Sequence, residues 1–101
     1  MELDHYKTKM NSDKNRFELA LDGELAKIDF KSGQRGQLYM THTEVPQKLE
    51  KRGVGHKLVR EALAWVEKNN ITVVPLCPFV KAFIQRNWED YKDLVDKAAK
   101  L

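Results

Sequence analysis

The sequence has little cysteine, proline or glycine, with one, three and five residues respectively among 101. A single cysteine excludes an internal disulfide, and a hydrophobic content of 42% with so few prolines excludes a disordered or low-complexity chain. The chain also lacks the apolar core of a signal peptide and any apolar span of about 18 residues. We therefore expect a cytoplasmic protein with no membrane partner.

Neither sign of charge dominates the sequence. Eighteen Lys and Arg residues stand against fifteen Asp and Glu, which gives a net charge of +3 and a pI near 9.0. This balance suits an anionic ligand but lacks the basic stripe of a nucleic-acid-binding protein, so we expect no nucleic-acid partner. Three histidines and one cysteine show no metal-ligand spacing, and no metal site is expected. The length predicts one domain, residues 1–101, which we expect to be a monomer.

The first half of the chain has the patterning of strands. Three are predicted, over residues 16–21, 24–30 and 37–45. Asp22 and Gly23 form a two-residue hairpin signal between the first two strands, and Pro46 must end the third. These features predict a short antiparallel meander.

The second half alternates helix and strand. Apolar residues recur at helical spacing in three segments, 54–69, 78–86 and 88–101. Residues 71–76 are short, β-branched and uncharged, which predicts an interior strand covered on both faces. The third strand, the long helix and this strand form a β-α-β unit with parallel strands and a right-handed connection. The predicted fold class is α/β, with a mixed sheet in which an antiparallel meander leads into the β-α-β unit, followed by short C-terminal helices.

Three segments of the β-α-β unit should meet at one edge of the sheet. They are the end of the third strand at residues 42–45, the start of the helix at 52–57, and Cys77 after the last strand. Ligands of open α/β sheets bind at such an edge. We therefore expect the functional site there.

Two of the five glycines, Gly53 and Gly55, lie at the start of the long helix. Glycine lets backbone N–H groups approach a ligand closely, and a helix N-terminus favours an anion. Lys51, Arg52 and Lys57 would supply countercharges to a phosphate. On the glycines alone, a turn that merely starts a helix is an equally good interpretation.

The motifs around these glycines carry a family resemblance. The string "RGVG" followed by "HKLV", within the longer pattern "HTEVP…RGVG…LV…VVPLCPFV", resembles the minimal, single-domain branch of the GNAT N-acetyltransferase superfamily. The resemblance covers about residues 16–95. It implies a compact GNAT-like fold and acetyl-CoA as cosubstrate. One departure is Glu50, which stands where the wider superfamily has Gln or Arg.

The resemblance also implies a set of residues for coenzyme A. The pyrophosphate would bind the amides of residues 51–56, and the pantetheine arm would lie beside the strand that ends at Val45. The cofactor-binding residues expected on this basis are Val45, Lys51, Arg52, Gly53, Val54, Gly55, His56, Lys57 and Phe79.

Cys77 is the first candidate for the chemistry. It precedes Pro78 at the N-cap position of a predicted helix, and a helix N-terminus stabilises a thiolate. A covalent route would have Cys77 take the acetyl group and pass it to an amine. The alternative is a small buried core residue, the usual place of a free cysteine.

His42 and Glu44 are the other catalytic candidates. Two residues apart on one strand, they point to the same face and would act as general base for an incoming ammonium. The alternatives are a hydrogen-bonded histidine that fixes the strand end and a solvated carboxylate. Thr43 between them should face the other way.

The functional hypothesis is an acetyl-CoA-dependent N-acetyltransferase. Larger GNAT enzymes insert helices between the first two strands, whereas here only Asp22 and Gly23 separate them. The acceptor side should therefore be open, which suits a bulky amine acceptor such as a protein lysine or amino terminus. The alternative is a noncatalytic coenzyme A or acyl-CoA binding module. A nucleic-acid binder has only the pI in its favour and ranks last.

Overall fold

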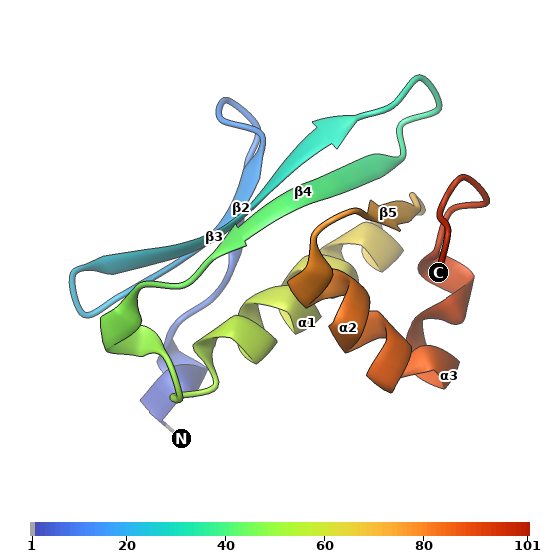
Figure 1. Ribbon diagram of the computed structural model, residues 1–101. Helices are drawn as coiled ribbons and strands as arrows, with labels where there is room; N and C mark the ends of the chain where they lie inside the picture. The colour runs from blue at the N-terminus through green and yellow to red at the C-terminus, as the bar shows by residue number, and fades with distance from the viewer. Residues whose placement is uncertain (1) are drawn as a thin grey trace.

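A five-stranded mixed sheet carries its helices on one face in the computed structural model, which describes residues 2–101 (Figure 1). The strands follow one another in the sheet as they do in the chain: β1 (Lys9–Asn11), β2 (Arg16–Leu21), β3 (Glu24–Ser32), β4 (Leu38–Glu44) and β5 (Val73–Pro75). The first four strands pair antiparallel, and β4 and β5 pair parallel. The predicted α/β class and the meander leading into a β-α-β unit are confirmed.

The helical elements are α1 (Val54–Lys68), α2 (Pro78–Arg86), α3 (Trp88–Tyr91) and the 3-10 helices η1 (Glu2–His5), η2 (Gln47–Leu49) and η3 (Lys92–Leu94). Helix α1 contacts β2 and β3, and α2 contacts β4, β5 and α1. Both helices pack their apolar faces against the same side of the sheet, and together they form one hydrophobic core. No helix in the described part of the chain combines the length and apolarity needed to span a membrane.

The two faces of the sheet differ in chemistry. The covered face presents a continuous apolar surface, to which β2 and β3 contribute Phe17, Leu19, Leu21, Ala26, Ile28 and Phe30. The other face, here called the outer face, carries charged neighbours on adjacent strands, among them Glu18, Lys27 and Glu44. An antiparallel sheet with one solvated face has this alternation.

A β-bulge at Thr41 changes which side chains of β4 face the helices. Phe30 of β3 pairs with Met40, but Asp29 pairs with His42, so Thr41 is an extra residue in β4. Met40 lies on the covered face before the bulge, and after the bulge Thr43 lies there, opposite Ile28. His42 and Glu44 are therefore on the outer face. A bulge adds one residue to one strand and so reverses the alternation beyond it.

Residues 71–76 do not form an interior strand. Strand β5 covers only Val73–Pro75 and lies at the end of the sheet order. Its three residues are nevertheless buried, because Val95 of the C-terminal segment forms a parallel bridge with Val73 on the side away from β4. The prediction of a buried strand is confirmed, and the prediction of an interior position is wrong.

The predicted helix over 88–101 is also wrong beyond its first turn, since α3 ends at Tyr91 and η3 at Leu94. The side chain of Asp96 is buried and accepts hydrogen bonds from Arg35 and Thr72, which fixes a non-helical backbone there. Strand β1 was not predicted, because its three residues are too few to show a period.

Candidate functional site

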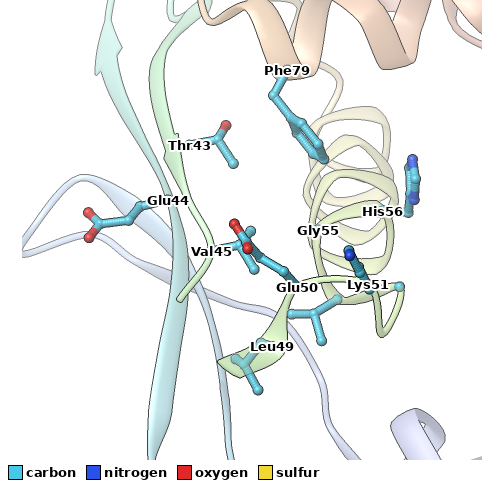
Figure 2. A pocket seen from close by; sticks show the side chains of 11 residues that line it. Thr43, Glu44, Val45, Leu49, Glu50, Lys51, Gly55, His56 and Phe79 are labelled. Atoms are coloured by element: carbon cyan, nitrogen blue, oxygen red, sulfur yellow. The ribbon is translucent and has the colours of Figure 1, made fainter. Parts of the chain in front are cut away.

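A pocket of about 480 Å³ lies where β4 ends and α1 begins (Figure 2). Its walls come from the end of β4, the loop through η2, the first turn of α1 and the start of α2. The lining residues are Thr43, Glu44, Val45, Leu49, Glu50, Lys51, Gly53, Val54, Gly55, His56 and Phe79. The predicted edge of the β-α-β unit therefore has a pocket.

Backbone amides at the start of α1 give the pocket an anion-binding character. The first backbone hydrogen bond of the helix runs from the Lys57 N–H to the Gly53 carbonyl at 3.0 Å. The amides of Val54, Gly55 and His56 precede it and have no acceptor in the helix. Gly53 turns the chain into the helix with a φ of 78°, a conformation that favours glycine. The positive end of the helix dipole adds to these donors.

Gly55 is required by the close approach of three elements. A Cβ at this position would lie 2.8 Å from Cζ of Phe79 and 3.5 Å from Cγ2 of Val45. Figure 2 shows the Phe79 ring extending from α2 toward the helix start, across from Thr43 and Val45. The missing side chain thus leaves room between β4 and α1. The result is a narrow, partly apolar channel beside the amides at the start of α1.

His56 connects the helix start to α2. Its ring centroid lies 6.0 Å from that of Phe79 and 5.9 Å from that of Phe83, both at tilted angles. The imidazole therefore packs against two aromatic rings. The backbone amide of His56 is one of the three at the helix start that have no acceptor within α1. His56 lies in the pocket wall, where the sequence predicted it.

The three predicted countercharges are placed differently from one another. Lys51 lines the pocket. Arg52 pairs with Asp22 of the β2–β3 turn, with its Nη1 2.7 Å from the carboxylate Oδ2. Lys57 is buried, and its Nζ contacts the Glu61 carboxylate at 3.0 Å. Of these three side chains, only that of Lys51 is in the pocket wall.

The Lys57–Glu61 pair belongs to the attachment of the N-terminal segment. Burial alone would raise the pKa of Glu61, but hydrogen bonds from the Thr8 N–H and the Lys57 ammonium lower it on balance. The charge of Lys57 is thus neutralised on the side of α1 that faces residue 8. The Lys57 side chain is therefore not placed to bind a phosphate in the pocket. Its backbone N–H instead makes the first hydrogen bond of α1.

Cys77 occupies the N-cap position of α2, as predicted, and is buried with 5% of its surface exposed. Its thiol donates a hydrogen bond to the Thr43 hydroxyl, with 3.1 Å between Sγ and Oγ1. Its amide and that of Leu76 both donate to the Met40 carbonyl, at 2.9 and 3.0 Å. The strands diverge at this point. Cys77 therefore lies behind Thr43, one hydrogen bond from the pocket wall.

His42 and Glu44 lie on one face of β4, as the sequence predicted, and the structure places them on the outer face. Their side chains are 61% and 60% exposed, and 3.9 Å separates Nε2 of the imidazole from Oε1 of the carboxylate. Figure 2 shows the Glu44 side chain pointing away from the pocket, although the residue contributes to its edge. Cys77 and the His42/Glu44 pair consequently lie on opposite faces of β4.

Comparison with known families now decides the assignment. The family model of GCN5-related N-acetyl-transferases matches residues 16–94. This protein belongs to that family. No curated protein matches the chain significantly. Membership in the GCN5-related family supports acyl transfer as the general chemistry, and its match includes the whole pocket described above.

Sequence reasoning assigned no role in this GCN5-related site to two of its lining residues, Thr43 and Leu49. The bulge at Thr41 has no sequence signature, so nothing indicated that Thr43 faces the pocket. Leu49 is fully buried in η2, a single turn too short to show helical periodicity. Across residues 2–101, His, Cys, Asp and Glu side chains nowhere gather in a group of three or more that could hold a metal ion.

Proposed function

We propose that this family member is an acetyl-CoA-dependent N-acetyltransferase. The observation that carries the proposal is the helix start at residues 54–56, whose amides have no acceptor within α1 and border a pocket that continues along β4 to Thr43. A phosphate-binding helix start beside a narrow apolar channel matches a ligand with a charged end and a thin arm. Family membership supplies the class of chemistry.

Within this proposal each part of the pocket binds a different part of coenzyme A. The amides of Val54, Gly55 and His56, with the Lys51 ammonium, bind the pyrophosphate. Val45 and the Phe79 ring flank the pantetheine arm, and Leu49 and Val54 supply the apolar floor. Arg52 and Lys57 support the loop and helix that present the amides. Acetyl-CoA, when bound, supplies the acetyl group as a thioester.

Two groups are available for the transfer itself. An amine attacks only in its neutral form, and His42, assisted by Glu44, is the exposed base that accepts its proton on the outer face. Cys77 offers a covalent route: its sulfur attacks the acetyl carbon, the bond to the coenzyme A sulfur breaks, and coenzyme A leaves as a thiol with the Cys77 proton. The neutral amine then attacks the same carbon, the bond to Sγ breaks, and the thiol of Cys77 is restored by the proton that the amine loses. The two-residue turn of Asp22 and Gly23 adds no helices between β2 and β3 that would enclose an acceptor, which suits a bulky acceptor such as a protein lysine or amino terminus.

Intact-protein mass spectrometry after incubation with acetyl-CoA tests the proposal directly. One acetyl adduct that hydroxylamine removes, and that is absent from Cys77→Ala, supports coenzyme recognition and the covalent route together. If no adduct forms, turnover of an amine acceptor is compared between wild type and His42→Ala. Loss of turnover in a folded His42→Ala protein with unchanged coenzyme A affinity supports direct transfer.

A noncatalytic acyl-CoA binding module is the second candidate. It is favoured by the 5% exposure of Cys77 and by the position of His42 on the face opposite to Thr43. This candidate predicts calorimetric binding of coenzyme A with no acetyl transfer to any amine. Absence of coenzyme A binding in the same titration contradicts both candidates.

The proposal also includes a monomer in the cytoplasm. A single cysteine suits a reducing compartment, and the site is complete within one chain. Size-exclusion chromatography with light scattering at several protein concentrations checks the oligomeric state.

A further inference from the structure

A second groove, of about 340 Å³, lies at the β5 edge of the sheet, away from the coenzyme pocket. Its lining comes from β4, β5, the start of α2 and the C-terminal segment. The residues are Tyr39, Val74, Pro75, Leu76, Lys81, Ala98, Ala99 and Lys100. Leu76, with 59% of its surface exposed, is the most exposed large hydrophobic side chain of the described residues. Nothing in the proposed coenzyme site uses this groove.

The groove and the coenzyme pocket border the same junction from opposite faces. Leu76 lines the groove, and Cys77, the next residue, hydrogen bonds to Thr43 in the wall of the coenzyme pocket. The amides of both residues donate to the Met40 carbonyl, where β4 and β5 diverge. Tyr39 pairs with Val74 across the parallel strands, which places both side chains on the outer face. A molecule in the groove is therefore next to the candidate chemistry without competing for the coenzyme pocket.

The charge at the groove is of one sign. Lys81 and Lys100 belong to its lining, and the exposed Lys31 pairs with Tyr39 across β3 and β4 on the same face. The lining contains neither Asp nor Glu. Asp96, the buried carboxylate two residues before Ala98, is already bonded to Arg35 and Thr72. The apolar floor thus has cations at its margin. The nearby carboxylates of Asp29 and Glu44 on the outer face lie 2.9 and 3.8 Å from the Lys27 ammonium, which offsets their charge.

We propose that this groove binds the acceptor, and that the acceptor is an acidic peptide segment of a protein. The inference rests on the proposed acetyltransferase function and adds the substrate class. The apolar floor around Leu76 takes an apolar side chain near the acceptor amine. Lys81, Lys100 and Lys31 attract the acidic residues that flank it, since complementary charge guides association and register. His42, also on the outer face, is on the side from which the amine would arrive.

The test is a binding titration followed by fluorescence anisotropy. The probe is a C-terminally labelled peptide with a free amino terminus, an apolar second residue and three glutamates, and its matched peptide has glutamines in place of the glutamates. We expect the acidic peptide to bind more tightly and to weaken as salt is added. Lys81→Glu with Lys100→Glu should weaken it about tenfold, because two attractive charges become repulsive toward the glutamates. Leu76→Ser should weaken both peptides.

Lys9→Glu with Lys14→Glu is the matched control, because it also reverses two exposed lysine charges, here in β1 and the β1–β2 turn at the opposite edge of the sheet. Calorimetric titration of each variant with coenzyme A separates the two proposals. Unchanged coenzyme A affinity with equal binding of both peptides overturns the acceptor assignment and leaves the acetyltransferase proposal standing. Binding of a single-stranded oligonucleotide that displaces the acidic peptide with higher affinity also overturns it. Loss of coenzyme A binding in the wild type contradicts the acetyltransferase proposal instead.

Discussion

The thiol of Cys77 donates a hydrogen bond to the hydroxyl of Thr43, with 3.1 Å between Sγ and Oγ1, across 34 residues of sequence. This contact joins the N-cap of α2 to the end of β4. It places the only thiol of the chain directly behind the wall of the pocket between β4 and α1. The Thr43 hydroxyl therefore positions the candidate nucleophile.

Thr43→Val keeps the shape of the side chain and removes this acceptor. Because a thiol is a weak donor, the free energy of unfolding should change by less than about 1 kcal/mol. The acetyl adduct on Cys77 should form more slowly than in wild type, and Thr43→Ser, which keeps the hydroxyl, should restore the rate. A mass-spectrometric time course measures both. Equal rates in wild type and Thr43→Val would show that Thr43 does not position the thiol.

Gly55→Ala tests the narrow channel between β4 and α1. The new Cβ would meet the Phe79 ring, at 2.8 Å from Cζ, so the ring must shift into the pocket. Coenzyme A affinity should fall while the free energy of unfolding changes by at most about 1 kcal/mol, because alanine also favours the helix. Phe79→Ala in the same chain removes the obstacle, and the double-mutant cycle should show coupling in affinity.

The control for this cycle is Gly53→Ala, whose effect has a different origin. At a φ of 78° the cost is conformational, about 1 kcal/mol or more, and nothing lies closer to the added Cβ than Cδ1 of Leu3 at 3.8 Å. Phe79→Ala should not relieve it. Additive effects of Gly55→Ala and Phe79→Ala on affinity would contradict the predicted clash.

Glu50→Gln tests the acidic residue in the wall of the anion site. Removing one exposed negative charge beside the phosphates should tighten coenzyme A binding about threefold at low salt, which corresponds to roughly 0.6 kcal/mol. The gain should shrink as ionic strength rises. Glu67→Gln makes the same change near the other end of α1 and should leave affinity unaltered. Calorimetry at two salt concentrations distinguishes the variants, and identical affinities would place the phosphates away from Glu50.

The buried Asp96 carboxylate makes the free energy of unfolding depend on pH. Hydrogen bonds from the Arg35 guanidinium, the Thr72 hydroxyl and the Ala98 N–H hold its pKa well below the ordinary value of 3.8. A carboxyl group whose pKa is lower in the folded state stabilises the fold above its unfolded pKa and loses this contribution as pH falls. Urea unfolding of wild type and Asp96→Asn should differ most near pH 7 and converge as the pH drops below 3.8. A constant difference across that range would contradict the assignment.

The elements that sequence predicted well have a strong local signal. Helix 78–86 was predicted with its bounds because Pro78 marks its start, and the β2–β3 hairpin because Asp22 and Gly23 adopt the positive φ angles that such turns require. The glycines at the start of α1 likewise predicted a ligand site there, and that stretch supplies five of the pocket's lining residues: Lys51, Gly53, Val54, Gly55 and His56.

The elements that sequence missed depend on distant partners. The bulge at Thr41 appears only when β3 and β4 are paired, so the side of β4 that faces the pocket was not predictable. The C-terminal segment has helical spacing, but Asp96 bonds to Arg35, 61 residues earlier, and Val95 pairs with Val73. These long-range contacts override the local helical preference.

The strands lie in the sheet in the same order as in the chain, and this order affects when each part can fold during synthesis. The antiparallel pairings of β1 to β4 join consecutive strands through turns, whereas the pairing of β4 with β5 must close a loop that contains all of α1. The antiparallel pairings close short loops, whereas the parallel pairing of β4 with β5 closes the longest loop of the sheet. On a ribosome the meander has all its residues once β4 emerges, but the pocket is complete only after Phe79 has left the exit tunnel. The pocket therefore forms later than the meander, after the crossover through α1 has closed.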